Sequence, residues 1–70
     1  MTIATKKLKM AMSALDVNQR ELATRINQLP ANLSKKIIAD NLRINEYASL
    51  LAALGCQLEI NVILPDGTKL

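Results

Sequence analysis

Chemically reactive side chains are scarce in this chain, which narrows the functions that it can have. The sequence contains no histidine and a single cysteine, Cys56, so neither a Ser-His nor a Cys-His catalytic pair can be assembled. A tetrahedral Cys/His zinc site is excluded for the same reason. The acidic residues are scattered along the sequence. The two glycines, Gly55 and Gly67, are placed where a helix or a strand ends and do not form a phosphate-binding loop. We therefore expect no enzyme activity, no metal and no cofactor, and a function in binding.

Composition and charge favour one small domain with an anionic partner. The 70 residues carry a net charge of +3, and Lys6, Lys7 and Lys9 crowd the start of the chain as either phosphate contacts or a solvated face. The only aromatic residue, Tyr47, argues against stacking platforms for single-stranded nucleic acid. No signal peptide opens the sequence and no apolar run approaches about 18 residues, so we expect a cytoplasmic protein without a membrane segment.

The central stretch VNQRELATRINQLPANLSKKII predicts two short helices joined by a tight turn. Asn18 suits the N-cap of the first helix, and Glu21 is placed to bond back to the N–H of that cap. Val17 and Leu22 have the spacing of a hydrophobic staple, which fixes the angle at which the chain enters the helix. Asn27 follows the helix and tolerates the left-handed backbone conformation that a tight turn requires.

The second helix of this pair follows the turn, and another helix precedes the pair. Pro30 suits the first turn of a helix, since its missing N–H costs nothing there, and Leu33 and Ile37 give this helix a face to bury. Residues from around Thr5 to Leu15 predict the first helix of the chain. Its apolar stripe at helical spacing consists of Leu8, Ala11, Met12 and Leu15.

A fourth helix is predicted over Glu46–Leu54. Asn45 is a plausible N-cap, and Gly55 is a strong C-terminal stop. Leu42 and Ile44, in the preceding loop, are expected to fill the base of the core. The apolar stripe of this helix consists of Tyr47, Leu50, Leu51 and Leu54.

Beyond Gly55 the apolar pattern changes from a helical to an alternating period. The sequence QLEINVIL over Gln57–Leu64 predicts a strand with one apolar face, followed by a turn at Pro65-Asp66-Gly67 and a short return over Thr68–Leu70. A lone hairpin leaves an exposed edge, so we expect the strand to pair antiparallel with a second copy. The residues of this expected dimerisation face are Leu58, Ile60, Val62 and Leu64.

The segment NQRELATRIN, with Ala23 where helices can cross closely, resembles the helix-turn-helix of the lambda-repressor/Cro (XRE) family, and the likeness extends to Ala53–Gly55. The resemblance implies a mainly α, four-helix DNA-binding domain over residues 1–55, with the motif at about 18–38. Residues 56–70 would form the C-terminal β-strand or short hairpin. The implied function is a phage- or mobile-element-type transcriptional regulator that binds operator DNA as a homodimer. An ordinary helical hairpin in a small bundle is the alternative.

The resemblance assigns roles to residues around the second helix of the motif. In that geometry the helix lies in the major groove, with its N-terminal residues at base edges. Pro30, Ala31 and Lys35 fall at base-contacting positions, with Ser34 and Asn32 beside them. Gln19 falls where the family binds phosphate. Lys36 and Arg43 are placed for phosphate or are merely solvated. The implied DNA-binding set is Asn18, Gln19, Pro30, Ala31, Asn32, Ser34, Lys35, Lys36 and Arg43.

Two residues depart from what base reading requires. Pro30 has no side-chain donor, and Ala31 offers only a methyl group, which suits contact with a thymine methyl. Leu29 is a poor N-cap for the helix that follows. The apolar tip Leu29-Pro30-Ala31 equally suits the groove of a protein. An antirepressor or modulator that binds a repressor protein is therefore the alternative function.

Overall fold

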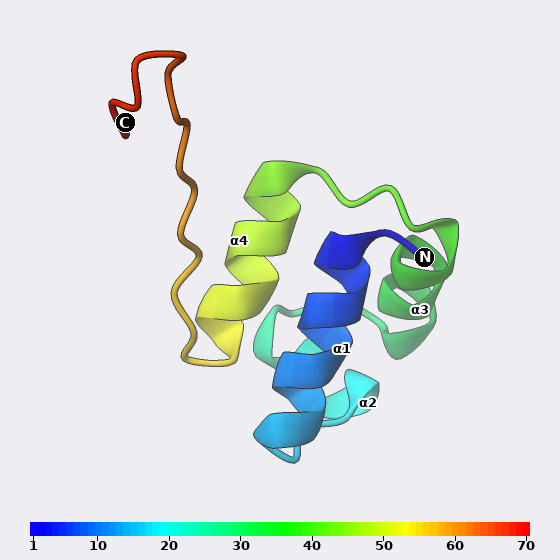
Figure 1. The fold of residues 1–70 in the computed structure, drawn as a ribbon. Helices are drawn as coiled ribbons and strands as arrows, with labels where there is room; N and C mark the ends of the chain where they lie inside the picture. The colour runs from blue at the N-terminus through cyan, green and yellow to red at the C-terminus, as the bar shows by residue number, and fades with distance from the viewer.

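Helices occupy most of residues 1–55 in this computed structural model, which describes the whole chain from residue 1 to residue 70. In chain order they are α1 (Ile3–Ala14), α2 (Gln19–Arg25), α3 (Pro30–Ala39) and α4 (Ile44–Ala53). α2 packs against both α3 and α4, and the start of α1 lies beside the end of α3 (Figure 1). The mainly α fold that the sequence predicts is confirmed. None of the helices has both the length and the apolar character that crossing a bilayer would require.

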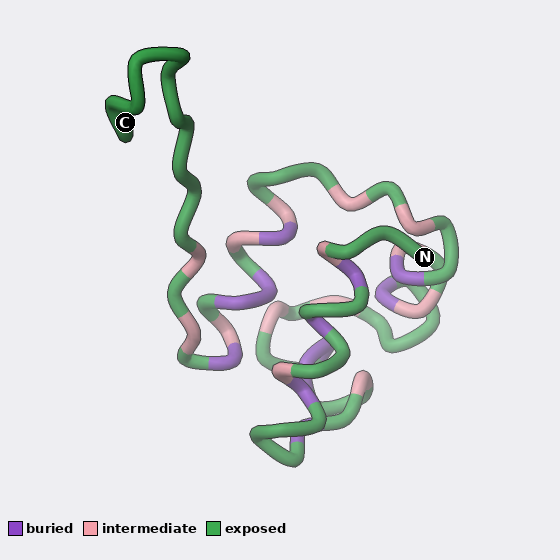
Figure 2. The backbone as a smooth tube through the Cα atoms, viewed as in Figure 1, coloured by how far each residue is buried: buried purple, intermediate pink, exposed green.

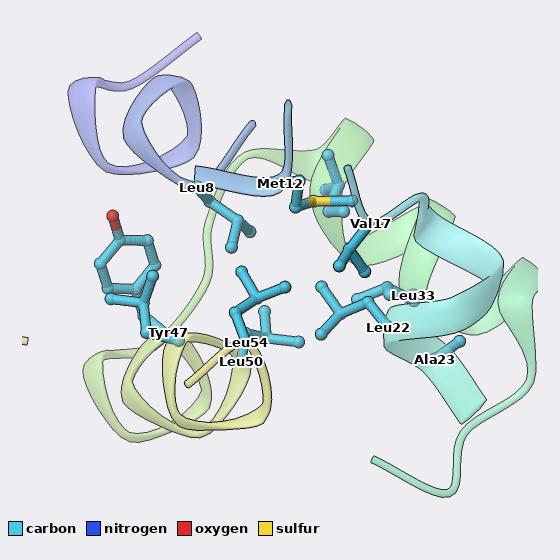
Figure 3. Close-up of a cluster of buried hydrophobic side chains, with 11 residues drawn as sticks. Leu8, Met12, Val17, Leu22, Ala23, Leu33, Tyr47, Leu50 and Leu54 are labelled. Carbon is cyan, nitrogen blue, oxygen red and sulfur yellow. The ribbon is translucent and has the colours of Figure 1, made fainter. Parts of the chain in front are cut away.

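Each helix contributes an apolar stripe to one shared core. Figure 2 shows the buried stretches turned toward the centre of the helical group, and Figure 3 shows their side chains converging there. Leu8, Leu22 and Ala23 have no exposed surface. Because the Ala23 side chain is small, α2 approaches its neighbours closely at this residue. The core consists of Leu8, Met12, Val17, Leu22, Ala23, Leu33, Ile37, Tyr47, Leu50, Leu51 and Leu54.

The entry into α2 and the turn after it follow the sequence prediction. The side-chain oxygen of Asn18 accepts a hydrogen bond of 2.8 Å from the N–H of Glu21, so Asn18 is the N-cap. Val17 and Leu22 are both buried in the core, as the staple requires. Asn27 adopts a positive φ of 56°. The exposed Glu21 carboxylate makes no return bond to the cap, so only half of the capping box forms.

α1 is displaced toward the N-terminus relative to its prediction. It begins at Ile3, before Thr5, because the Thr2 hydroxyl caps it by accepting a hydrogen bond of 3.3 Å from the Thr5 N–H. It ends at Ala14. Leu15, which we expected in the core, is the C-cap and is 47% exposed.

The predicted start of α4 is wrong. The helix begins at Ile44, and the N-cap is Arg43, whose carbonyl accepts a hydrogen bond of 2.8 Å from the Tyr47 N–H. Asn45 lies inside the first turn. The N-cap position is therefore occupied by a residue that makes no side-chain cap hydrogen bond. Of the two expected core residues in the preceding loop, Leu42 packs against the core, whereas Ile44 is 58% exposed.

The C-terminal strand that the sequence predicts over Gln57–Leu64 is not formed in the single chain. The segment runs extended along α4 and then past the helices, as Figure 1 shows. The predicted terminal turn and short return do form, with an isolated bridge between Ile63 and Lys69 and backbone hydrogen bonds between Val62 and Leu70. The backbone groups from residue 57 to residue 61 have no backbone partner. A strand requires a neighbouring strand, and three residues after the turn cannot supply one for the whole segment.

Candidate nucleic-acid interface

A run of four exposed residues, Leu29 to Asn32, forms the N-cap and first turn of α3. The inward face of α3 is anchored by Leu33 and Ile37, which are 1% and 2% exposed. The outward residues Pro30, Ala31 and Asn32 are exposed, and so is Lys35 one turn later. α3 is therefore held to the core along one side and leaves its opposite side free for a partner.

The first turn of α3 has an open backbone donor. Leu29 occupies the N-cap without a side-chain hydrogen bond, as its apolar side chain predicts. Its carbonyl accepts from the N–H groups of Asn32 and Leu33, but the Ala31 N–H has no backbone partner. An exposed N–H at a helix N-terminus, where the helix dipole is positive, suits an anion such as a phosphate.

A cleft beside α3 brings together polar residues from three helices. It is about 460 Å³ in volume, and its lining includes Lys9 of α1, Gln19 at the start of α2 and Ser34 of α3. Ser34 and Gln19 are half-buried, whereas Lys9 is exposed. The structure thus places Lys9 in the same cleft as two of the residues that the sequence assigned to DNA. The sequence left Lys9 undecided because nothing in its local pattern indicates which helices it faces.

The far end of this cleft is closed by Asp40, the left-handed C-cap of α3 with a φ of 58°. Its carboxylate accepts hydrogen bonds from the Thr2 N–H (2.6 Å) and the Thr2 hydroxyl (2.9 Å). Hydrogen bonds from Thr5 and Thr2 lower the pKa of Asp40 to about 2. These donors hold the end of α3 against the start of α1 and offset the negative charge beside the cleft.

Lys36 and Arg43 have different surroundings from the predicted residues that line this cleft. The Lys36 ammonium lies 3.0 Å from the Glu46 carboxylate on α4, and this hydrogen bond lowers the pKa of Glu46. Arg43 is exposed at the N-cap of α4. Neither residue lines the cleft that contains Lys9, Gln19 and Ser34. The Asn18 side-chain oxygen is engaged in capping α2, whereas the side-chain NH₂ of this exposed residue remains able to donate.

Comparisons with protein families, with curated proteins and with solved structures find no match to this chain. The functional assignment therefore depends on the chain's own residues and geometry. No group of three or more acidic or cysteine side chains is placed to hold a metal ion. The arrangement around α3 offers hydrogen-bond donors and cations on an exposed helix, which is chemistry for holding an anionic surface.

Proposed function

We propose that this protein is a DNA-binding transcriptional regulator of the lambda-repressor/Cro type that places α3 in the major groove. The observation that carries the proposal is the exposed N-terminal half of α3 beside a cleft that holds Lys9, Gln19 and Ser34. Phosphate contacts fix the register of such a protein on the duplex, and contacts to base edges supply its specificity. The two kinds of contact require adjacent surfaces. Here the two surfaces are the exposed N-terminal half of α3 and the cleft beside it.

The contacts divide between the two surfaces. Lys35 is the main direct reader of bases, helped by Asn32, and Ala31 contacts a thymine methyl. Gln19 and Ser34 bind phosphate, with Lys9 supplying the positive charge. Lys36 is not needed for this role because it is paired with Glu46.

Selection of bound sequences from a random pool of duplex DNA tests the function directly. The proposal requires that one sequence class be enriched. Lys9→Gln should then lower the slope of log affinity against log salt by about one unit, since one neutralised phosphate contact is lost. Lys69→Gln, in the tail, is the matched control and should leave the slope unchanged. A pool that shows no enrichment would contradict the proposed function.

Gln19 allows a second test, because an uncharged phosphate contact has a different signature. Gln19→Ala should weaken binding to every duplex by a similar factor, with little change in salt slope, because phosphates carry no sequence information. Titration of the selected and a scrambled duplex measures both quantities. A variant with altered sequence preference and intact overall affinity would contradict the assignment of Gln19.

The proposed regulator acts as a homodimer through residues 57–64. Ile60 and Val62 are 57% and 53% exposed, and Leu64 is 38% exposed, although all three are apolar. Leu58 packs against the core and ties the segment to α4. Antiparallel pairing with a second copy would use the open backbone groups of residues 57–61 and cover the apolar face. A two-fold axis there would present two α3 helices to half-sites about 34 Å apart.

The dimer is tested by placing the same charge on either face of the segment. Ile60→Asp should give a monomer with weaker operator binding and largely intact helicity, whereas Ile63→Asp, on the opposite face, is the matched control. Asn61→Pro removes a ladder donor and should act like Ile60→Asp. Sedimentation and circular dichroism measure the outcome. A parent protein that is monomeric at high micromolar concentration would contradict the dimer.

A second candidate function is binding to another protein, such as a repressor. It is favoured by the exposed apolar residues at both ends of α3, Leu29 at 67% and Ile38 at 79%. Contiguous exposed apolar surface marks protein-binding sites, and Leu29 continues into the exposed Pro30 and Ala31. Gel shift against random duplex at low salt separates the two functions, because a DNA-binding protein shows at least weak, salt-sensitive affinity.

A further inference from the structure

The hairpin at the C-terminus shows which edge of the extended segment is already occupied. The Val62 N–H donates to the Leu70 carbonyl at 3.4 Å, and the Leu70 N–H donates back to the Val62 carbonyl at 2.8 Å. The Leu64 N–H donates to the Thr68 carbonyl at 2.8 Å. The backbone groups of the even-numbered residues therefore face the short return after the turn.

The other edge of the segment belongs to the odd-numbered residues, because successive residues of a strand direct their backbone groups to opposite edges. On this edge Glu59, Asn61 and Ile63 have no backbone hydrogen bond, and every residue from Glu59 to Leu70 is exposed (Figure 2). A second copy can pair there without disturbing the hairpin. The product is a sheet of four strands, two from each copy, which is stable where a lone hairpin is marginal.

The alternation of side chains restricts the register of this pairing. Directly opposite residues of antiparallel strands point to the same face of the sheet, so the two apolar faces coincide only if even-numbered residues lie opposite even-numbered ones. The two-fold axis then passes through a residue that lies opposite its own copy. The residues on which the axis can centre within the segment are Glu59, Ile60, Asn61 and Val62.

Charge and length disfavour three of these four registers. An axis at Glu59 sets its two carboxylates directly opposite each other, and an axis at Ile60 sets them on a diagonal of about 7–8 Å. Like charges in such positions oppose pairing. An axis at Val62 leaves Leu58 opposite Asp66 of the partner subunit, which lies in the turn and outside the strand.

We propose that two copies of the chain pair with Asn61 opposite Asn61 of the partner subunit. Leu58 then lies opposite Leu64 of the partner subunit, and Ile60 lies opposite Val62 of the partner subunit. All four residues of the apolar face are thus paired across the axis, and the two Glu59 carboxylates are kept apart. The inference rests on the proposed homodimer and adds the register, which sets how the two helical domains are placed relative to each other.

Disulfide cross-linking measures the register, because two cysteines bridge only when their Cα atoms lie within about 7 Å. Directly opposite residues are about 4.5–5.5 Å apart, whereas diagonal neighbours are about 7–8 Å apart. Cys56 is replaced by alanine, and a single cysteine is introduced at one position of the segment. In a glutathione buffer we expect Asn61→Cys to become mostly covalent dimer, and Ile60→Cys or Val62→Cys alone to remain mostly uncross-linked.

Two further samples complete the experiment. An equimolar mixture of Ile60→Cys and Val62→Cys should form the mixed covalent dimer, because these residues lie opposite each other in the proposed register. Gln57→Cys is the matched control for random collision, since Gln57 is exposed on the same segment but lies far from its own copy. It should remain uncross-linked. Non-reducing electrophoresis and mass spectrometry measure each product.

Sedimentation of the parent protein separates the register from the homodimer on which it rests. A parent that is monomeric at high micromolar concentration contradicts the homodimer and the register together. A dimeric parent in which Ile60→Cys or Val62→Cys cross-links to itself more fully than Asn61→Cys overturns the register alone. So does a dimeric parent in which Asn61→Cys forms no more covalent dimer than Gln57→Cys.

Discussion

The two helices of the central motif are neighbours in the chain but differ in what they bury and expose. α2 has a side-chain N-cap in Asn18 and places Leu22 and Ala23 fully inside the core. α3 begins at Pro30, its N-cap Leu29 makes no side-chain hydrogen bond, and Pro30, Ala31 and Asn32 are exposed. The difference indicates that α2 supports the structure, whereas the solvent side of α3 is available for a partner. Substitutions at the buried residues of α2 should therefore affect folding, and substitutions on the outer face of α3 should affect binding.

The largest effect is expected in the core of α2. Leu22→Ala should lower the free energy of unfolding by about 2–5 kcal/mol, because it leaves a cavity at a side chain with no exposed surface. Ile38→Ala, at a residue of α3 that is 79% exposed, should stay within about 0.5 kcal/mol of the parent. Urea denaturation measures both. Similar losses in the two variants would remove the distinction between the helices.

Lys35→Ala, on the outer face of α3, should affect DNA binding and leave stability unchanged. Stability should be unchanged, since Lys35 is exposed, while affinity for a selected DNA site should fall by about 1–3 kcal/mol. Titration of the selected and a scrambled duplex makes the measurement. An equal loss on both duplexes would make Lys35 a phosphate contact rather than a reader of bases.

The N-cap of α2 makes a side-chain hydrogen bond and that of α3 does not, which predicts stability changes of opposite sign when each cap residue is replaced. Asn18→Ala removes the acceptor of the Glu21 N–H and should destabilise the protein by about 1 kcal/mol. Leu29→Ser should stabilise it by up to about 1 kcal/mol, because the backbone there is already extended and the first turn of α3 lacks a side-chain acceptor. Thermal unfolding followed by circular dichroism checks both. A loss of stability in Leu29→Ser would show that Leu29 contributes packing that its exposure does not indicate.

The smallest effect concerns the C-terminal end of α3. The pKa of Asp40 is lowered from 3.8 to about 2, so the folded state holds its ionised form more tightly than the unfolded state does. The resulting stabilisation is fully present above pH 3.8 and is lost as the pH falls toward 2. Thr2→Val removes a hydroxyl donor to Asp40 and should reduce this acid-dependent loss, as measured by unfolding at a series of pH values. An unchanged pH profile would contradict the role of Thr2.

Local features of the helices could be predicted from the sequence because neighbouring residues determine them. The cap at Asn18, the buried Val17 and the left-handed Asn27 each follow from short-range chemistry. The start of α4 could not be predicted in this way, since the N-cap is Arg43, which makes no side-chain cap hydrogen bond, and not the cap-forming Asn45. Propensity is a weak guide wherever tertiary contacts compete with it.

The candidate site was only partly predictable for the same reason. The sequence indicates which residues of α3 are polar, but not that Lys36 pairs with Glu46 or that Lys9 lies near Gln19. Both arrangements depend on how α1 and α4 cross α3. The alternating pattern of residues 57–64 indicates a strand, yet a strand also requires a partner that the single chain does not contain.

Binding of the parent protein to random duplex DNA at two salt concentrations tests the central claim most directly. Fluorescence anisotropy of a labelled duplex gives the affinity for any sequence, so no operator has to be identified first. The account predicts measurable binding at low salt, with log affinity falling linearly against log salt by roughly 0.9 for each phosphate contacted. An absence of binding at low salt, or an affinity that does not change with salt, would contradict the assignment of α3 to DNA.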